Sequence, residues 1–294
     1  MNSTKVAVVT GANKGIGYAI VKGLCKHFNG KVYLTSRDET RGIAAVNELK
    51  QMGLQPLFHK LDVSDEDSVK NFKEYIEEHD GGIDVLVNNA GITFTQDSND
   101  SIGTRAEVTL ATNYFGTLRV CEILFPLLRP NAQVVNISSA LGHLSCIPSP
   151  NLRLKLSDPT LTIPHVSELM NQFIRDAKNN EHVEQGWGNV AYSVSKVGIC
   201  ALTIVQQKEF DKENRPISVN SVHPGYVDTD MTNHTGALTI DQGATAPLYL
   251  ALGGHDLKGQ YVWFDCSIAD WYAPQAPKEK YKNFLPSHHY IVCT

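Results

Sequence analysis

Tyr192 and Lys196 are the two residues of the sequence whose types and spacing most clearly permit chemistry. They stand four positions apart, so a helix would place them on one face, about one turn apart. A phenol is a poor acid at neutral pH because its pKa lies near ~10, and a fixed ammonium beside it favours the phenolate and lowers that pKa. The pair therefore predicts a tuned proton donor. A solvated Tyr and Lys on a helix surface is the alternative.

A glycine-rich segment, 10–17, reads Thr-Gly-Ala-Asn-Lys-Gly-Ile-Gly and directly follows the apolar run 6–9. Its glycines permit a tight turn and let the backbone approach a pyrophosphate, and the helix that follows offers unpaired N–H groups at its N-terminus. In this strand–loop–helix setting the segment predicts dinucleotide binding, with a purely structural turn as the alternative. The expected cofactor contacts here are Gly11, Asn13, Lys14, Gly15, Ile16 and Gly17.

The choice between NADPH and NADH depends on the residue about twenty positions beyond the glycines, where an acid holds the ribose 2′-hydroxyl and a base holds a 2′-phosphate. That position is Arg37, and Lys14 adds a second cation from inside the glycine segment. Arg41 stands one turn further on and is expected to assist. Asp38 could repel a phosphate, and we expect it to point away. These residues favour NADPH; for Arg37 the alternative is a solvated charge at the end of a strand.

The elements that must position these residues alternate along the chain. Short β-branched runs alternate with longer amphipathic stretches, a pattern typical of an α/β, Rossmann-type, doubly wound parallel sheet of about seven strands with helices on both faces. Ser64 is expected to cap the third helix, whose first turn is acidic. The expected strands lie near 6–9, 32–34, 56–59, 85–87, 134–137, 217–222 and 260–264, and the expected helices near 16–28, 40–52, 65–79, 106–128, 167–178, around Tyr192 and near 241–252.

Two segments depart from this rhythm. Residues 141–186 are rich in Pro, Ser and charge and show no clear strand, so we interpret them as a helical insertion before Tyr192. Residues 272–294 are polar and Pro-rich and are expected to form a loosely attached C-terminal extension. The remainder, 1–271, is expected to form a single Rossmann-type domain.

Parallel sheets bind ligands at the carboxyl ends of their strands, so residues that follow the predicted strands are candidate contacts. Asp62 and Val63 follow the third strand, where an adenine could rest. Ser139 ends the fifth strand, and its hydroxyl could bind a substrate carbonyl. The segment 224–229 follows the sixth strand and would close over a nicotinamide. The expected cofactor contacts at this edge are Asp62, Val63, Asn89, Ala90, Gly91, Pro224, Gly225, Val227 and Thr229.

The composition is that of a soluble globular protein. The 294 residues include 42% hydrophobic and 19% charged residues, with a formal net charge of −5. The absence of a long basic run argues against nucleic acid or an anionic membrane as a partner. No apolar stretch reaches the length of a membrane span, and we expect a cytoplasmic protein with free thiols, because its six cysteines form no Cys-x-x-Cys pair. No metal site is expected; His288 and His289 lack further ligands.

Taken together and in order, these motifs strongly resemble the short-chain dehydrogenase/reductase family over about residues 1–265. Within that family the chain is most similar to the animal monomeric NADPH-dependent carbonyl reductases, notably over 10–17, 84–92 and 184–187. The motifs that carry the resemblance are Thr10-Gly11-x-x-x-Gly15-x-Gly17, Asn88-Asn89-Ala90-Gly91, Asn113, Ser139, Tyr192-x-x-x-Lys196 and Pro224-Gly225.

The resemblance implies a role for each catalytic residue. Tyr192 would protonate the substrate carbonyl oxygen, and Lys196 would lower the pKa of Tyr192 and hold the nicotinamide ribose. Ser139 would orient the carbonyl, and Asn113 would hold a water molecule in a proton relay. Tyr192 and Lys196 thereby also count as cofactor contacts, and Ser139, Tyr192 and Tyr226 as substrate contacts.

The activity that the resemblance implies is NADPH-dependent reduction of aldehydes, ketones and quinones to alcohols or hydroquinones. Two alternatives remain: a dedicated reductase of one metabolite ketone, such as a steroid, prostaglandin, pteridine or terpenoid, and a non-catalytic NADP(H)-binding module. The resemblance further implies a monomer, because the insertion covers helix faces that other members use to form tetramers. His223 and Tyr226 replace a cysteine and a tryptophan of the carbonyl reductases, and we expect His223 to be structural.

Overall fold

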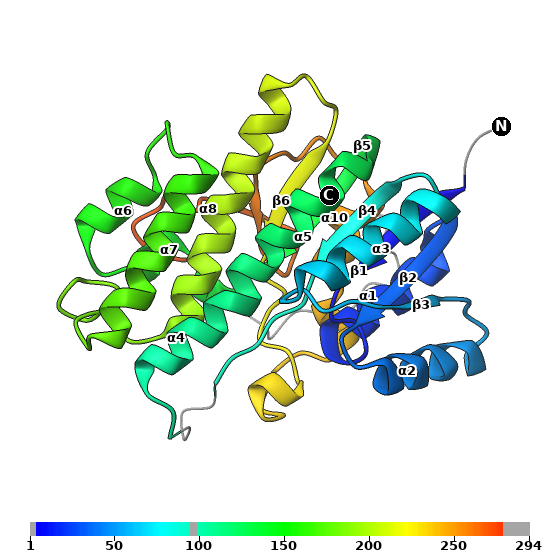
Figure 1. Ribbon diagram of the computed structural model, residues 1–294, viewed down its shortest axis with the longest axis horizontal. Helices are drawn as coiled ribbons and strands as arrows, with labels where there is room; N and C mark the ends of the chain where they lie inside the picture. The colour runs from blue at the N-terminus through cyan, green and yellow to red at the C-terminus, as the bar shows by residue number, and fades with distance from the viewer. Residues whose placement is uncertain (1–3, 95–98, 279–294) are drawn as a thin grey trace.

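The computed structural model describes residues 4–94 and 99–278, and within them one sheet carries helices on both faces (Figure 1). The strand order is β3-β2-β1-β4-β5-β6-β7-β8. The chain moves outward from β1 to β3 and then returns to pair β4 with β1, and such a reversal opens a crevice at the carboxyl ends of the strands. The strands are β1 (Lys5–Val9), β2 (Gly30–Ser36), β3 (Leu57–Lys60), β4 (Ile83–Asn88), β5 (Leu128–Ile137), β6 (Ser218–Val222), β7 (Tyr261–Val262) and β8 (Ile268–Ala269).

The predicted doubly wound sheet is confirmed, with eight strands in the described residues instead of about seven. The extra strand is β8, which has two residues and pairs antiparallel with β7. A strand of that length carries no readable periodicity, so the sequence pattern could not predict it.

Side chains of β1 alternate between the two faces of the sheet, as the period of a strand requires. Ala7 and Val9 pack with α1 (Gly15–His27) and α10 (Thr245–Leu252), whereas Val6 and Val8 pack with α3 (Glu66–His79) and α5 (Thr117–Leu124). All four are buried, because helices cover both faces. The helices are α1 (Gly15–His27), α2 (Glu39–Gln51), α3 (Glu66–His79), α4 (Ile102–Leu110), α5 (Thr117–Leu124), α6 (Pro150–Leu156), α7 (Ile163–Lys178), α8 (Ala191–Lys212), α9 (Ile240–Gly243) and α10 (Thr245–Leu252).

The prediction of one continuous helix over 106–128 is wrong, because the helical stretch is interrupted. The chain forms α4, then a π-helical turn, η1 (Ala111–Gly116), then α5 and a short 3₁₀ turn, η2 (Phe125–Leu127), before β5 begins at Leu128. A π turn inserts one residue into the helical repeat, and no hydrophobic periodicity signals it.

The cap of α3 also differs from the prediction. Asp65, not Ser64, caps the helix, because its carboxylate accepts hydrogen bonds from the backbone N–H groups of Asp67 and Ser68. The Ser64 hydroxyl instead donates to Asp62 Oδ1 at 2.6 Å. Both residues have side chains suited to capping, so sequence alone could not choose between them.

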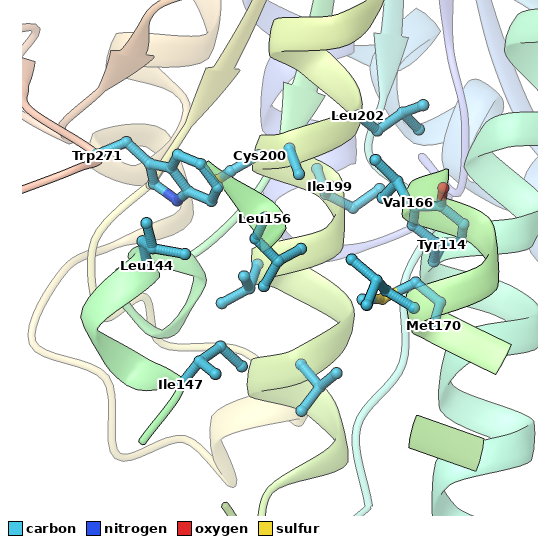
Figure 2. Packing of buried hydrophobic residues seen from close by; sticks show 14 of the residues in the cluster. Tyr114, Leu144, Ile147, Leu156, Val166, Met170, Ile199, Cys200, Leu202 and Trp271 are labelled. Carbon is cyan, nitrogen blue, oxygen red and sulfur yellow. The ribbon is translucent and has the colours of Figure 1, made fainter. Parts of the chain in front are cut away.

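The segment 141–186 contains two helices where one was expected. α7 begins at Ile163, earlier than the expected 167, because Thr162 caps it and Pro164 lies in its first turn. α6 precedes it and was not predicted. α7 packs against α4 and α8, and Figure 2 shows the shared hydrophobic core, to which Leu156 of α6 and Met170 of α7 contribute.

The C-terminal part of the sheet is attached to the turn that follows β5. The Tyr261 hydroxyl donates to the Ser139 carbonyl at 2.6 Å, and Trp271 Nε1 donates to the Gly142 carbonyl at 2.7 Å. His143 Nε2 donates to the Asp270 carbonyl at 3.0 Å. The expected extension begins just beyond, but its larger part, 279–294, with His288 and His289, lies outside the described residues.

No helix among residues 4–94 and 99–278 combines the length and apolar character needed to cross a bilayer. Over the same ranges, no group of three or more His, Cys, Asp or Glu side chains is arranged to hold a metal ion.

Candidate active site

A cavity of about 800 Å³ lies at the carboxyl ends of β1, β2 and β4, between the glycine segment and the chain that follows β6. Most of the predicted cofactor contacts line it, although they come from five separate parts of the sequence. These lining residues are Gly11, Asn13, Lys14, Gly15, Ile16, Gly17, Arg37, Arg41, Asp62, Val63, Asn89, Ala90, Gly91 and Thr229.

The glycine segment lies so close to the residues after β4 that a side chain could not be accommodated at Gly11 or Gly17. Gly11 has φ +61°, and a Cβ there would lie 2.8 Å from Ala90 Cα. A Cβ on Gly17 would lie 2.4 Å from Asn89 Nδ2. The Asn89 amide itself donates to the carbonyls of Thr10 and Gly11 at 2.9 and 3.0 Å, so it holds the segment in place.

Thr10 supplies a contact that sequence reasoning missed. Its hydroxyl oxygen accepts hydrogen bonds from the backbone N–H groups of Asn89 and Ala90, both at 3.0 Å. The signal was present, since Thr10 opens the glycine motif, but only the pairing of β1 with β4 shows what the hydroxyl contacts.

The N-terminus of α1 is suited to an anion. Lys14 is its N-cap residue and makes no side-chain capping hydrogen bond, and the first turn of α1 contains no acid. Uncapped N–H groups and the positive end of the helix dipole therefore lie beside the cavity. Together with the close-fitting glycines, this arrangement fits the pyrophosphate of a dinucleotide.

The cationic side chains around the cavity differ in whether they are paired with a carboxylate. Arg37 is exposed, lines the cavity and makes no ion pair with any residue of the described ranges. Arg41 Nε is bound to Asp38 Oδ2 at 2.7 Å. Asp38 also lines the cavity, and its carboxylate caps α2 and accepts hydrogen bonds from the Arg41 backbone and side chain, which lower the pKa of Asp38. Its charge is thus compensated, and Lys14 pairs with Asp230. That Asp38 points away from a bound phosphate stays a prediction.

Tyr192 and Lys196 lie on the first two turns of α8, as predicted. Lys196 Nζ is 5.6 Å from the centre of the Tyr192 ring and donates to the Ile137 carbonyl at 2.7 Å. The lysine side chain is buried, and burial lowers the pKa of Lys196 to about 8. A Cβ placed on the cavity residue Gly91 would lie 3.6 Å from Lys196 Nζ, so the lysine reaches this end of the cavity.

The pKa of Tyr192 differs from the expectation. Burial raises the pKa of Tyr192 to about 12, and a hydrogen bond with the Ser139 side chain is the effect that lowers it. The Lys196 ammonium is directed to the Ile137 carbonyl instead of the phenol oxygen. Desolvation therefore dominates over the predicted effect of the neighbouring charge.

The structure separates the roles of the two serines after β5. Ser139 has its hydroxyl beside Tyr192, and that oxygen also accepts a hydrogen bond from the Leu141 N–H at 3.2 Å. Ser138 is buried, and its hydroxyl donates to the Lys196 carbonyl at 3.2 Å. Only Ser139 therefore has its hydroxyl beside Tyr192, and its predicted role in binding a substrate stays a prediction.

Asn113 lies in the π turn η1 and is buried. Its amide Nδ2 donates to the Ile92 carbonyl at 2.9 Å and to the Ser195 hydroxyl at 3.0 Å, and its Oδ1 accepts from the Ile92 N–H at 2.8 Å. Asn113 thus fixes the backbone after β4 to the first turn of α8. Its predicted role in holding a water molecule stays a prediction, and Ser195 is a contact that sequence reasoning missed.

The chain after β6 lines the cavity mostly with residues other than the predicted ones. Among its predicted contacts only Thr229 lines the cavity. Pro224 and Val227 are buried, and Gly225 packs closely against Leu238, so their contacts with a cofactor stay predictions. Tyr226 is 42% exposed, and its hydroxyl lies 2.5 Å from the Thr235 hydroxyl.

His223 behaves as a structural residue, as expected. It is buried, with its ring 4.4 Å from Trp263 and its Nδ1 accepting from the Gly225 N–H at 3.3 Å. Several lining residues were not predicted, because the loops that bring them to the cavity carry no motif. These are Leu61, Ile92, Thr93, Thr112, Asp228, Asp230, Met231, His234, Thr239 and Ile240.

Comparison with known proteins adds independent information. The sequence model described as short chain dehydrogenase matches residues 5–150 and 181–238. The unmatched stretch between them, 151–180, holds α7 and most of α6.

Two curated relatives are similar over most of their length. Carbonyl reductase [NADPH] 3 of Mus musculus is 44% identical over 253 residues, which is 85% of this chain and 91% of that protein. Carbonyl reductase [NADPH] 1 of Homo sapiens is 42% identical over 264 residues, which is 88% of this chain and 95% of that protein.

Two solved structures are similar in fold as well as in sequence. Salutaridine reductase from Papaver somniferum has a TM-score of 0.81 and 33% identity, covering 89% of this chain and 100% of that one. Menthone neomenthol reductase from Mentha piperita has a TM-score of 0.76 and 28% identity, covering 89% of this chain and 99% of that one.

Proposed function

Because this chain belongs to the short-chain dehydrogenase family, we propose that it is an NADPH-dependent reductase of aldehydes, ketones and quinones, which it converts to alcohols or hydroquinones. The observation that carries the proposal is the placement of the Ser139 side chain beside the Tyr192 phenol, with the Lys196 ammonium 5.6 Å from the centre of the Tyr192 ring. Curated relatives that are 44% and 42% identical are named NADPH carbonyl reductases, which supports both the cofactor and the reaction class.

Different residues of the cavity would hold different parts of the cofactor. The glycine segment and the uncapped N-terminus of α1 would hold the pyrophosphate. Arg37 and Lys14 would hold the 2′-phosphate that distinguishes NADPH from NADH. When bound, NADPH supplies the hydride that reduces the carbonyl carbon.

Tyr192 acts as the proton donor. Its pKa of about 12 keeps the phenol protonated at neutral pH, which is the state that reduction requires, because the carbonyl oxygen must gain a proton. The Ser139 hydroxyl binds the same oxygen and orients it toward Tyr192. Negative charge that develops on the substrate oxygen is therefore met by two half-buried hydroxyl donors.

Lys196 contributes a buried cation beside the ring of Tyr192. The ammonium stabilises negative charge on the phenol oxygen after the proton has left, and it is held in position by the Ile137 carbonyl. Asn113 fixes the adjacent backbone at Ile92, so the end of the cavity keeps its shape.

We further propose that the protein is a monomer. α7 packs along α4 and α8 and buries its apolar residues there, including Val166, Met170 and Phe173. An apolar helix face that is already covered within one chain is not available to a second copy.

A dedicated reductase of one ketone is the second candidate. Two structures that closely match this fold, with TM-scores of 0.81 and 0.76, are named after single substrates, salutaridine and the menthone group. A panel of unrelated carbonyls separates the two: comparable kcat/KM across the panel supports a broad reductase, and one dominant substrate supports a dedicated one.

The test of the proposed function is Tyr192→Phe, assayed by the loss of NADPH absorbance with menadione or a nitrobenzaldehyde. Removal of the proton donor is expected to lower kcat by about 10²–10⁴ while NADPH still binds. Tyr272→Phe, which removes an exposed phenol outside the site, is the matched control and should keep full activity.

An unchanged rate in Tyr192→Phe would show that the proton comes from another group. A wild-type protein that binds NADPH but oxidises it with no carbonyl of the panel would instead support the non-catalytic binding module.

A further inference from the structure

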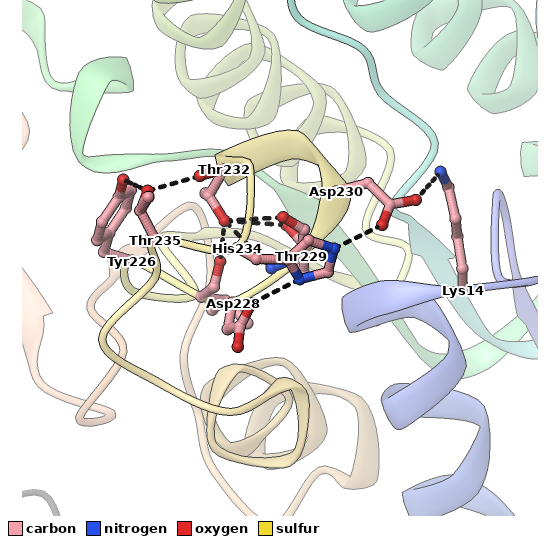
Figure 3. A network of polar contacts seen from close by, with 9 residues as sticks. Lys14, Tyr226, Asp228, Thr229, Asp230, Thr232, His234 and Thr235 are labelled. Carbon is pink, nitrogen blue, oxygen red and sulfur yellow. Dashed lines mark hydrogen bonds and ion pairs between the residues drawn. The ribbon is translucent and has the colours of Figure 1, made fainter.

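An ion pair joins two distant parts of the chain at the mouth of the cavity. Lys14 Nζ, from the start of α1, lies 2.5 Å from Asp230 Oδ2, from the chain after β6 (Figure 3). Both residues line the cavity in which the cofactor is proposed to bind. Lys14 is also the N-cap residue of α1, so its backbone lies at the helix end that is proposed to hold the pyrophosphate.

His234 extends this contact into a four-membered chain of charged groups. Its Nε2 lies 3.1 Å from Asp230 Oδ1, and its Nδ1 lies 2.8 Å from Asp228 Oδ1. The two oxygens of Asp230 therefore face different partners, one His234 and the other Lys14. The imidazole lies between two carboxylates. It offsets their negative charge only when it is protonated.

The backbone is shaped to hold His234 in this position. Asn233 has φ 50° and His234 has φ 56°, so two successive residues other than glycine are in the left-handed region. That conformation costs energy and persists only where surrounding contacts hold it. Here the Thr232 hydroxyl ties the turn together by donating to the Val227 carbonyl at 2.7 Å.

We propose that Asp230 is a positioning residue that restrains Lys14 at the mouth of the cavity, and that the charge on His234 sets how readily Lys14 transfers to a phosphate of the cofactor. The inference rests on the proposed function, because it takes Lys14 to be a phosphate ligand. With His234 protonated, Asp230 keeps a cationic partner when Lys14 leaves. With His234 neutral, Lys14 leaves an uncompensated carboxylate, and Asp228 and Asp230 both oppose the incoming phosphate.

The direction of the pH dependence follows from the partners of His234. Asp228 and Asp230 raise the pKa of His234 above its ordinary value of 6.5, so its charge is fully present below that value and is lost as the pH rises through the raised pKa. Lys14 lowers the pKa of Asp230. Arg37, Asp62 and the paired Asp38 and Arg41 are the other charged groups among the residues that line this cavity. Cofactor affinity is therefore expected to fall as the pH rises past neutrality.

The first measurement compares wild type with His234→Gln, by calorimetric titration of the full chain with NADP⁺, which lacks the acid lability of NADPH. The 2′-phosphate itself titrates near ~6, but it does so equally in both proteins, so their ratio reports His234 alone. At about pH 6 the variant should bind about two- to fivefold more weakly, the range typical of an exposed ion pair, and at about pH 8.5 the two should agree. The same ratio at both pH values would overturn the role of His234.

The second measurement uses Asp230→Asn. Release of Lys14 and loss of a carboxylate should tighten NADP⁺ binding about two- to fivefold at about pH 8.5. Asp241→Asn is the matched control, because Asp241 pairs with Lys22 of the same helix α1 at 2.5 Å but does not line the cavity. It should leave the affinity unchanged. Equal effects of the two variants, or weaker binding by Asp230→Asn, would overturn the inference.

Lys14→Gln separates failure of the inference from failure of the proposed function. This variant should bind NADP⁺ more weakly, and in its background Asp230→Asn should lose most of its effect, because Asp230 acts through Lys14. If Lys14→Gln alone leaves the affinity unchanged, the assignment of Lys14 as a phosphate ligand is wrong. If it weakens binding and Asp230→Asn keeps its full effect, only the inference is wrong.

Discussion

Burial sets the charge states of the two residues with which the chemistry begins. It raises the pKa of Tyr192 to about 12 and lowers that of Lys196 to about 8, so each group is moved toward its neutral form. At neutral pH the site therefore contains a protonated phenol beside a buried cation that is costly to keep charged. The sequence supplies a phenol and an ammonium. Burial decides the order of their pKa values, so Lys196 loses its proton at a lower pH than Tyr192 does.

The cost of the buried lysine predicts a pH-dependent difference in stability between wild type and Lys196→Met. The pKa of Lys196 is about 8 in the folded protein, against an ordinary value of 10.5. Between these values the unfolded chain holds a proton that the folded chain has released, so raising the pH favours the folded wild type. From about pH 8 to about pH 10, wild type should gain about 2 kcal/mol in free energy of unfolding relative to Lys196→Met.

Urea unfolding of both proteins at the two pH values measures this difference directly. Comparison with Lys196→Met cancels the titration of buried thiols and phenols, which both proteins share. Lys212→Met, on the exposed end of the same helix, serves as the control and should show a smaller change. A difference in free energy of unfolding that does not vary with pH would mean that burial does not lower the pKa of Lys196 in the folded protein.

At the scale of elements, the insertion 141–186 packs into the hydrophobic core. α7 has a strongly one-sided distribution of apolar residues, and its buried side meets α4 and α8. The Phe173 ring lies 5.7 Å from that of Trp187, whose Nε1 donates to Asp176 Oδ2 at 2.8 Å. The insertion is thereby tied to the segment that leads directly into α8 and Tyr192.

This packing predicts that Phe173→Ala destabilises the whole domain. A fully buried ring that is replaced by a methyl group leaves a cavity, so the expected loss is about 3–5 kcal/mol in the free energy of unfolding. Asn171→Ala, on the exposed side of the same helix, should change stability by less than about 0.5 kcal/mol. Chemical denaturation followed by circular dichroism measures both, and similar small losses would show that α7 folds apart from the core.

At the scale of the whole molecule, the site is assembled from both ends of the described chain. The turn that carries Ser139 is held by Tyr261 of β7 and by Trp271, which follows β8. The glycine segment is held by Asn89 from the end of β4. These contacts all occur within one chain, so segments far apart in its sequence together hold the site in place.

The proposed monomer predicts a solution mass near 32.4 kDa. The reason is that α7 already covers the faces of α4 and α8. Light scattering across a range of protein concentrations measures the mass, and a value four times larger would contradict the proposal. Addition of NADPH should not change it, since none of the residues that line the cavity belongs to α4, α7 or α8 among the parts of the chain that the structure describes.

How much was predictable from the sequence depends on the range of the interaction. The glycine segment, the spacing of Tyr192 and Lys196 and the position of Ser139 after a strand are local patterns, and backbone geometry turns such patterns directly into structure. The parallel sheet then brought Arg37, Asp62 and Gly91 to one edge, as the strand–helix alternation had predicted. The second helix of the insertion and the π turn at Asn113 were not predictable, because short or irregular elements leave no periodic signal.

Sequence alone determined that the glycine segment and the residues that directly follow the strands meet at the carboxyl edge of the sheet, since hydrophobic periodicity fixes strands and helices and their order fixes the edge. Only the tertiary structure decided how those groups are charged and what they contact. The high pKa of Tyr192, the compensation of Asp38 by Arg41 and the engagement of Lys14 with Asp230 all depend on burial or on distances between atoms. Electrostatic energies change steeply with both quantities, and neither is encoded in the spacing of residues along the chain.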